Sequence, residues 1–207
     1  MAQENLTTLY IVRHGESDWN TQKIIQGHNS KSALTEKGRE QAQGLAEKLR
    51  DIHFDAVFSS DLLRAKQTAE IIALEKNLAV KTTELLRERN FGKYEGQPWG
   101  SDNEIIELLA KYHTLTDEQK SGIEQDGVET NEQMLSRFIT FVREIAAGYI
   151  GQTVLVITHG GIIARILVHL GWSSGLRRGS IQNAAHVKLK SDGVDFFLEE
   201  VNGVAKK

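Results

Sequence analysis

The sequence predicts an α/β fold in which a largely parallel sheet is covered by helices on both faces. Two observations support this fold class: short apolar runs of β type alternate with helical patterns, and 207 residues suffice for one medium-sized domain. The apolar runs predict strands at residues 8–13, 55–60, 79–84, 153–158, 185–190 and 195–201. The last two flank a turn signal at residues 191–193, so we expect a hairpin in which one strand runs antiparallel.

Helical patterns lie between these runs. Thr35 is the expected N-cap of the first, which continues to Arg50. The second is expected to open at residues 60–61 and the third to cover about residues 129–149, where apolar side chains recur at helical spacing. The fourth is expected to open at residues 160–161, directly after a predicted strand.

Residues 92–128 are less regular. They contain the one proline of the chain, several glycines and a short helical stretch near residues 103–112. We interpret them as a lid-like excursion over the pocket of a single domain that spans residues 1–207. Within the excursion, Tyr94 and Trp99 either form an apolar lid or pack on the core, and the sequence does not decide between these alternatives.

Composition argues against several classes of protein. The net charge of −3 disfavours a general nucleic-acid binder. The chain has no cysteine, which excludes disulfides, thiolate catalysis and cysteine metal sites. The first residues lack the layout of a signal peptide, and no apolar run approaches the roughly 20 residues needed to cross a bilayer. We therefore expect a cytoplasmic protein that binds neither nucleic acid nor membranes.

Two strand ends carry the residues best suited to chemistry. The first predicted strand ends in Arg13-His14-Gly15. The strand predicted at residues 153–158 ends in His159 and Gly160. Because open α/β sheets bind their ligands at the carboxyl edge, we expect the two imidazoles to converge on one pocket.

The basic residues near these strand ends indicate a phosphate site. Arg64 is expected in the first turn of the helix after residues 55–60, where the helix dipole also favours an anion. Arg13 leaves the end of the first strand, and arginine offers a planar fork of donors that matches phosphate oxygens. Two arginines and two histidines would surround a dianionic phosphoryl group. The expected partner is therefore a small phosphorylated metabolite.

An imidazole can serve as the nucleophile in such a site, because an unprotonated ring nitrogen is available at neutral pH. Phosphoryl transfer then depends on alignment and charge stabilisation. The leaving alkoxide needs a proton, which Glu88, just after the strand predicted at residues 79–84, could donate. A bound phosphate disfavours ionisation of a nearby carboxyl group, which suits a general acid. No metal-ligand spacing such as His-Glu-x-x-His competes with this route.

Taken one at a time, these residues also fit ordinary structural roles. A histidine at a strand end is more often structural than catalytic, Arg64 alone would be a solvated arginine, and Glu88 alone a surface residue. The remaining histidines are assigned to structural roles: His28, His53, His113, His169 and His186. The prediction depends on the complete ordered set.

The set belongs to a longer series of motifs. Arg13-His14-Gly15-Glu16 is followed in order by motifs at residues 34–42, 59–69, 86–96 and 158–161. The series resembles the histidine phosphatase superfamily, the phosphoglycerate mutase-like proteins, over nearly the whole chain. The resemblance implies a three-layer α/β/α sandwich with a six-stranded, mostly parallel sheet.

The resemblance also implies a role for each residue. His14 would become phosphorylated, and Glu88 would donate and later accept a proton. The phosphoryl group would be held by Arg13, Arg64 and His159. The phosphate and substrate side of the pocket would be lined by Asn20, Gln26, Gly27 and Gly160. This family branch uses no metal and no organic cofactor, so none is expected here.

Phosphatases and mutases of this family share the phosphohistidine and differ in the group that accepts the phosphoryl. Mutases usually carry a lysine after the Gly-x-x-x-Gly stretch and two arginines further on, which hold the substrate carboxylate. Here Gln-Pro-Trp follows residues 92–96, residues 90–136 contain no arginine, and Gly161 stands where mutases have asparagine. We expect a phosphomonoesterase of the histidine acid phosphatase type that acts on sugar phosphates or phosphoglycerate-like esters.

Two alternatives remain open at this point. One is a cofactor-dependent phosphoglycerate mutase. The other is a non-catalytic phosphate-binding regulatory module, although the complete set of catalytic residues argues against it. The sequence leaves the physiological substrate, regulation and the formation of a homodimer undecided.

Overall fold

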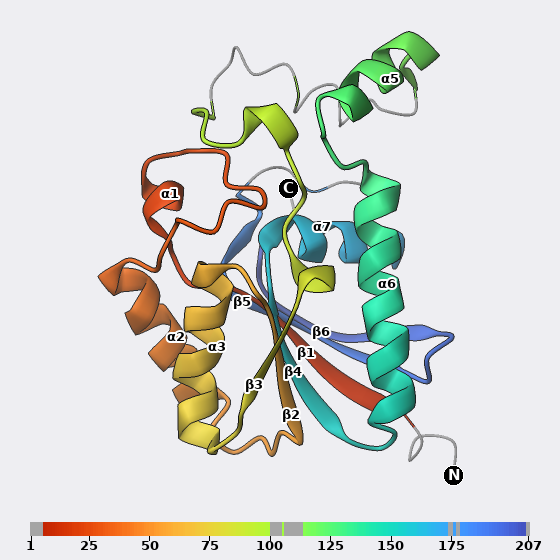
Figure 1. Cartoon of the computed structure of the whole chain (residues 1–207). Coiled ribbons are helices and arrows are strands. Elements are labelled where there is room, and N and C mark those ends of the chain that lie inside the picture. The colour runs from red at the N-terminus through yellow and green to blue at the C-terminus, as the bar shows by residue number, and fades with distance from the viewer. Residues whose placement is uncertain (1–5, 100–104, 106–113, 174–175, 177–178, 206–207) are drawn as a thin grey trace.

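The computed structural model describes residues 6–99, 105, 114–173, 176 and 179–205. In this part of the chain, strands form one six-stranded sheet in the order β3-β2-β4-β1-β5-β6 (Figure 1). The strands are β1 (Thr7–Arg13), β2 (Ala56–Ser60), β3 (Val80–Thr83), β4 (Thr153–Thr158), β5 (Ile181–Ser191) and β6 (Phe196–Val204). Each predicted strand is present, and β5 begins at Ile181 instead of at residue 185.

The sheet is mixed in direction. β1 pairs in parallel with β4, β4 with β2, and β2 with β3. β5 runs antiparallel to β1 and forms the predicted hairpin with β6. The six-stranded, mostly parallel sheet implied by the resemblance is therefore confirmed.

Four of the helices correspond to the predicted patterns: α2 (Glu36–Lys48), α3 (Leu63–Lys76), α6 (Asn131–Gly148) and α7 (Gly160–His169). Thr35 caps α2 as predicted, since its side chain accepts a hydrogen bond from Gly38 N at 3.0 Å. The predicted start of the second helix at residues 60–61 is wrong. Ser60 Oγ instead accepts a bond from Leu62 N at 3.3 Å, which forms a turn before the helix begins at Leu63.

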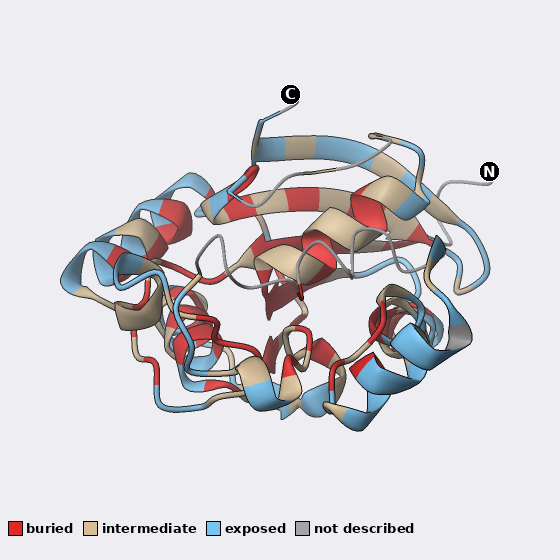
Figure 2. Cartoon of the chain, turned by 90° about the horizontal axis from the view of Figure 1, so that it is seen from above, coloured by how far each residue is buried: buried red, intermediate tan, exposed pale blue. Residues whose placement is uncertain are grey.

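Alternate side chains of the central strands face opposite helix layers. Tyr10 and Val12 of β1 pack with α2 and α3, whereas Leu9 and Ile11 pack with α6 and α7. Seen from above in Figure 2, buried residues concentrate on the sheet and on the inner sides of the helices, and the outer sides are exposed. The sheet therefore separates two apolar cores, as a three-layer sandwich requires.

The excursion at residues 92–128 has a small apolar cluster of its own. It begins with the 3-10 turn η2 (Gly92–Tyr94) and includes α5 (Asp117–Gln125). The buried members of the cluster are Ile25, Phe91, Ile105, Ile123 and Val128. The helical stretch predicted near residues 103–112 lies, apart from Ile105, outside the described residues. Because Ile25 belongs to this cluster, the excursion packs against the loop that follows the short helix α1 (Asp18–Thr21).

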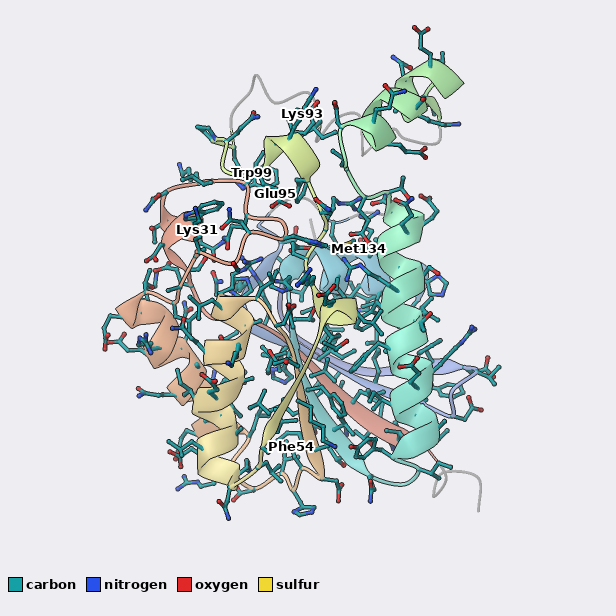
Figure 3. The ribbon with its side chains drawn as sticks, viewed as in Figure 1. Lys31, Phe54, Lys93, Glu95, Trp99 and Met134 are labelled. Atoms are coloured by element: carbon teal, nitrogen blue, oxygen red, sulfur yellow. The ribbon has the colours of Figure 1, made fainter. Side chains whose placement is uncertain are left out.

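Two aromatic side chains of the excursion pack in this cluster. Trp99 Nε1 donates to Ile24 O at 2.9 Å, and the Trp99 ring lies edge-on to Phe91 at 5.5 Å between centroids. Tyr94 donates its hydroxyl to Asp126 Oδ2 at 3.1 Å. Figure 3 shows Trp99 in the upper part of the molecule, near the labelled Glu95. Both rings therefore pack within the apolar cluster of the excursion.

No helix in the described part of the chain combines the length and the apolar character needed to span a bilayer.

Candidate active site

The two predicted histidines lie side by side at the carboxyl edge of the sheet. In the parallel ladder of β1 and β4, Arg13 stands opposite Thr158, so the next residue of each strand is a histidine. His14 N donates to Thr158 O at 3.0 Å, which continues the ladder by one step. The rings of His14 and His159 are 5.1 Å apart between centroids, and their exposed fractions are 3% and 0%.

Hydrogen bonds assign the tautomer of His14. Its Nδ1 lies 2.6 Å from Gly15 O, and because a carbonyl oxygen can only accept, Nδ1 carries the hydrogen. The other nitrogen, Nε2, accepts a bond from Arg64 Nε at 3.3 Å. Burial, followed by the charges of Arg64 and Arg13, holds the pKa of His14 well below its ordinary value. The ring is therefore neutral at pH 7, with the lone pair of Nε2 toward Arg64.

A close approach of two backbone segments explains the glycine after His14. A Cβ on Gly15 would lie 2.3 Å from Gly38 O in the first turn of α2. Gly15 N donates to Thr68 Oγ1 of α3 at 3.1 Å. The start of α2 and the side chain of Thr68 thus fix the backbone from which the His14 ring projects.

Arg64 is fully enclosed and is oriented by a loop. Its exposed fraction is 1%, and its Nη2 and Nη1 donate to Gly27 O at 2.9 Å and to Asn29 O at 3.0 Å. Burial lowers the pKa of Arg64 to about 10, so the guanidinium group stays charged at neutral pH. Gly27 has φ +49, and a Cβ there would overlap Glu95 Oε1, so this loop conformation requires glycine.

His159 differs from His14 in its hydrogen bonding. Both of its ring nitrogens are buried, and neither has a hydrogen-bond partner among the residues that the structure describes. Burial, then the charge of Arg64, lowers the pKa of His159 well below its ordinary value. Buried polar atoms are normally hydrogen-bonded, so two such nitrogens beside a guanidinium group indicate a place for a ligand oxygen.

Arg13 reaches the same region over the first residue of α7. Its Nη1 donates to Ile181 O of β5, and its Nε lies 3.3 Å from the position that a Cβ on Gly160 would take. Gly160 therefore allows the Arg13 side chain to cross the start of α7 closely. Two guanidinium groups and two imidazoles thus gather around the ends of β1 and β4.

Glu88 approaches from the segment after the 3-10 turn η1 (Glu84–Leu86). Its Oε2 accepts from Gly161 N at 3.0 Å in the first turn of α7, and its Oε1 accepts from Arg89 N at 2.9 Å. A Cβ on Gly161 would lie 2.2 Å from Glu88 Oε1. Gly161 therefore leaves room for the Glu88 carboxylate.

Two further predicted residues meet at Ser17. Asn20 Oδ1 accepts from Ser17 N at 3.1 Å, and Gln26 Oε1 accepts from Ser17 Oγ at 3.1 Å. Asn183 Nδ2 donates to Asn20 Oδ1 at 3.3 Å and to His14 O at 3.2 Å, which ties Asn20 to the backbone of His14. Gly27 differs from these residues, since its carbonyl oxygen faces Arg64.

Several residues beside the site were not among the candidates named from the sequence. They are His28, Glu95, Glu129, Arg137 and Asn183. His28 was assigned to the structural histidines, yet its Nε2 lies 2.8 Å from Glu88 O. Glu95 lies within the motif at residues 86–96 but was assigned no role there, and the other four belong to no motif, because their contacts join segments far apart in the chain. A cavity of about 540 Å³ lies beside this group, with His28, Asn90 and Arg137 among its lining residues.

Comparisons with known proteins agree with this geometry. The profile of the histidine phosphatase superfamily (branch 1) matches residues 9–203. Phosphoglycerate mutase-like protein 4 of Arabidopsis thaliana is 35% identical over 158 residues, which are 75% of this chain and 67% of that protein. The metal-independent phosphoserine phosphatase of Arabidopsis thaliana is 34% identical over 188 residues, 88% of this chain and 76% of that protein.

A solved structure extends the likeness to the fold. The phosphoglycerate mutase from Bacillus anthracis str. Sterne superposes with a TM-score of 0.79 at 29% identity, over 96% of this chain and 93% of that one. The sheet, the order of the motifs and the family profile agree over most of the chain. The chain therefore belongs to the histidine phosphatase superfamily.

Proposed function

We propose that this chain is a phosphatase that hydrolyses small phosphomonoesters through a phosphohistidine on Nε2 of His14, without a metal ion. The observation that carries the proposal is the His14 ring itself. It is neutral, buried and fixed through Nδ1, and its unprotonated nitrogen, Nε2, accepts a hydrogen bond from an arginine that can hold a phosphoryl group. Such a nitrogen needs no deprotonation before it attacks phosphorus.

The first half-reaction transfers the phosphoryl group to the enzyme. Nε2 of His14 forms a bond to phosphorus while the ester P–O bond breaks. Arg13, Arg64 and His159 stabilise the charge on the three equatorial oxygens, which is the main requirement of phosphoryl transfer. The leaving oxygen takes the proton of Glu88, so the alcohol departs neutral and Glu88 becomes a carboxylate.

The second half-reaction returns the enzyme to its starting state. A water molecule loses a proton to the Glu88 carboxylate as its oxygen attacks the phosphohistidine. The P–N bond breaks, the electron pair returns to Nε2, and inorganic phosphate leaves. Glu88 thus regains the proton that it gave up in the first half-reaction.

We propose water and not a second substrate hydroxyl as the acceptor, because arginine side chains that would bind a substrate carboxylate are missing from the segment at residues 90–136. Lys93, a lysine of this segment, is paired with Asp126 at 2.7 Å. Without an arginine in this segment to bind a substrate carboxylate, a phosphoglycerate would have less to hold it while it reorients. Sugar phosphates and phosphoglycerate-like esters are the substrate classes that we propose.

The test is to trap the intermediate. The purified protein is mixed with a ³²P-labelled phosphomonoester, quenched in alkali, and digested for mass spectrometry. We expect an acid-labile phosphate on His14, and a loss of turnover of at least about 10³-fold in His14→Ala. Turnover that survives this substitution, or a protein that binds phosphate but hydrolyses no ester, would contradict the proposal; the second result would identify the binding module instead.

A further inference from the structure

The segment that carries Glu88 is held by an arginine that belongs to none of the sequence motifs. Arg137 lies in α6, and its Nη1 donates to Leu85 O at 2.8 Å. Its Nη2 donates to Glu88 O at 2.9 Å. One guanidinium group therefore fixes the backbone at both ends of the stretch from Leu85 to Glu88.

An ion pair sets the orientation of this guanidinium group. Arg137 Nε donates to Glu129 Oε1 at 2.6 Å, and Nη2 lies 2.9 Å from Glu129 Oε2. The side chains of the pair are 16% and 13% exposed, so solvent screens the contact little. A bidentate pair of this kind fixes the plane of the guanidinium as well as its position. The two carbonyl contacts of Arg137 are therefore directional.

The helix that supplies Arg137 is firmly anchored. Thr130 and Gln133 form a capping box at its first turn. Met134 and Phe138 are buried in the core, with exposed fractions of 0% and 1%, and Figure 3 shows Met134 on the inner side of α6. Because α6 is held in place by this packing, the Arg137 guanidinium group fixes the Glu88 segment relative to the helix.

Other contacts complete the support from different sides. His28 Nε2 lies 2.8 Å from Glu88 O, and since an oxygen only accepts, His28 donates. Thr158 Oγ1, at the end of β4, donates to Leu86 O at 2.8 Å. Arg137 is the residue that contacts this segment at two carbonyls and also carries its own oriented partner.

We propose that Arg137 is a positioning residue for Glu88, and that it fixes the distance over which the proton reaches the leaving oxygen. The inference rests on the proposed function, in which Glu88 is the proton donor. Arg137 is assigned no contact with the substrate. Its loss should therefore impair protonation of the leaving group and leave the attack of His14 on phosphorus largely intact.

Esters with different leaving groups separate these two effects. p-Nitrophenolate leaves without a proton, so its phosphate ester needs little help from a general acid. The alkoxide of glycerol 2-phosphate leaves only with a proton. The ratio kcat/KM reports the steps up to departure of the first product, so it isolates this half-reaction from hydrolysis of the phosphohistidine.

The experiment measures kcat/KM on both esters for wild type, Glu88→Gln, Arg137→Met and Arg137→Lys. In Glu88→Gln and Arg137→Met, we expect kcat/KM to fall about 10²-fold on glycerol 2-phosphate and less than about fivefold on p-nitrophenyl phosphate. Arg137→Lys keeps the positive charge but loses the planar, bidentate guanidinium group. Its kcat/KM should therefore fall about tenfold on glycerol 2-phosphate and stay unchanged on p-nitrophenyl phosphate. Arg143→Met, on the exposed side of the same helix, is the matched control and should behave as wild type.

The outcomes separate this inference from the function on which it rests. Arg137→Met removes the partner of the mostly buried Glu129 carboxylate; if this variant does not fold, Arg137→Lys, checked by circular dichroism, decides the question. Equal losses on the two esters in the folded Arg137 variants, with an ester-dependent loss in Glu88→Gln, overturn the positioning role and leave the proposed function intact. Equal losses in Glu88→Gln itself overturn both this inference and the assignment of Glu88 as the proton donor.

Discussion

Burial controls the charge of the two imidazoles of the candidate active site, His14 and His159. The pKa of His14 and that of His159 are each lowered well below the ordinary value of 6.5, with burial as the largest cause. A neutral ring suits a nucleophile, but it also makes the folded protein sensitive to acid. In the unfolded chain the same rings are exposed to water and take up protons at their ordinary pKa.

This difference predicts a loss of stability at mildly acidic pH. Because the folded-state pKa lies below the unfolded one, the unfolded chain binds more protons below about pH 6.5. The free energy of unfolding should then fall as the pH decreases from 6.5, by up to about 1.4 kcal/mol per pH unit for each buried histidine. Urea titrations between pH 5 and 8 measure this slope. His14→Gln removes one titrating ring and should flatten it, and an unchanged slope would contradict the assignment.

A second prediction concerns the glycine beside Glu88. In Gly161→Ala, the new Cβ would lie 2.2 Å from Glu88 Oε1, so the carboxylate must move. We expect kcat/KM on an alkyl phosphate to fall by at least about tenfold, because displacement of a catalytic group is costly. Inhibition by inorganic phosphate should stay nearly constant. The control is Gly44→Ala in α2, where a Cβ meets nothing within 4 Å; similar losses in the two variants would refute the explanation.

At the scale of elements, the excursion supports the loop that holds Arg64. Glu95 Oε1 accepts from His28 N at 2.7 Å and from Phe91 N at 3.1 Å, so one oxygen joins that loop to the excursion. Glu95→Ala should release the Gly27 carbonyl from Arg64 and weaken phosphate inhibition about tenfold. Glu95→Gln keeps an acceptor oxygen, so its inhibition by phosphate should weaken much less. Inhibition constants for inorganic phosphate give the comparison, and equal effects of the two substitutions would argue for a charge effect instead.

The sequence predicts those elements whose signals are local. The strands follow from apolar runs, and the start of α2 follows from Thr35, whose side chain is a typical N-cap. The start of α3 was misplaced because Ser60 serves a turn and not a cap. The short helix α1 was not predicted, because four residues are too few to show a helical period.

The distinction between local and long-range signals also applies to the site residues. His14 and His159 could be identified because each follows a strand, and strand ends meet at one edge of a sheet. Arg137 could not, since its partners at Leu85 and Glu88 are 52 and 49 residues away and no local pattern records such contacts. A residue that supports a catalytic group through the backbone is visible only once the tertiary fold is known.

At the scale of the whole molecule, the fold is shared with mutases, so the fate of the phosphoryl group is the open question. Supplied with 3-phosphoglycerate and a trace of 2,3-bisphosphoglycerate, the protein should release free phosphate faster than it forms 2-phosphoglycerate. A coupled enolase assay and a phosphate assay measure the two products in parallel. Faster formation of 2-phosphoglycerate would show that the absence of arginine from residues 90–136 does not matter. Addition of EDTA should leave phosphate release unchanged.

His14 and His159 leave neighbouring strands at the same level of the ladder. The gap between their backbones is therefore the spacing common to all hydrogen-bonded strands, about 4.8 Å. That spacing survives insertions, deletions and new side chains in the surrounding loops. Exchange of the surrounding loops between relatives should accordingly leave this reactive pair of imidazoles unaltered.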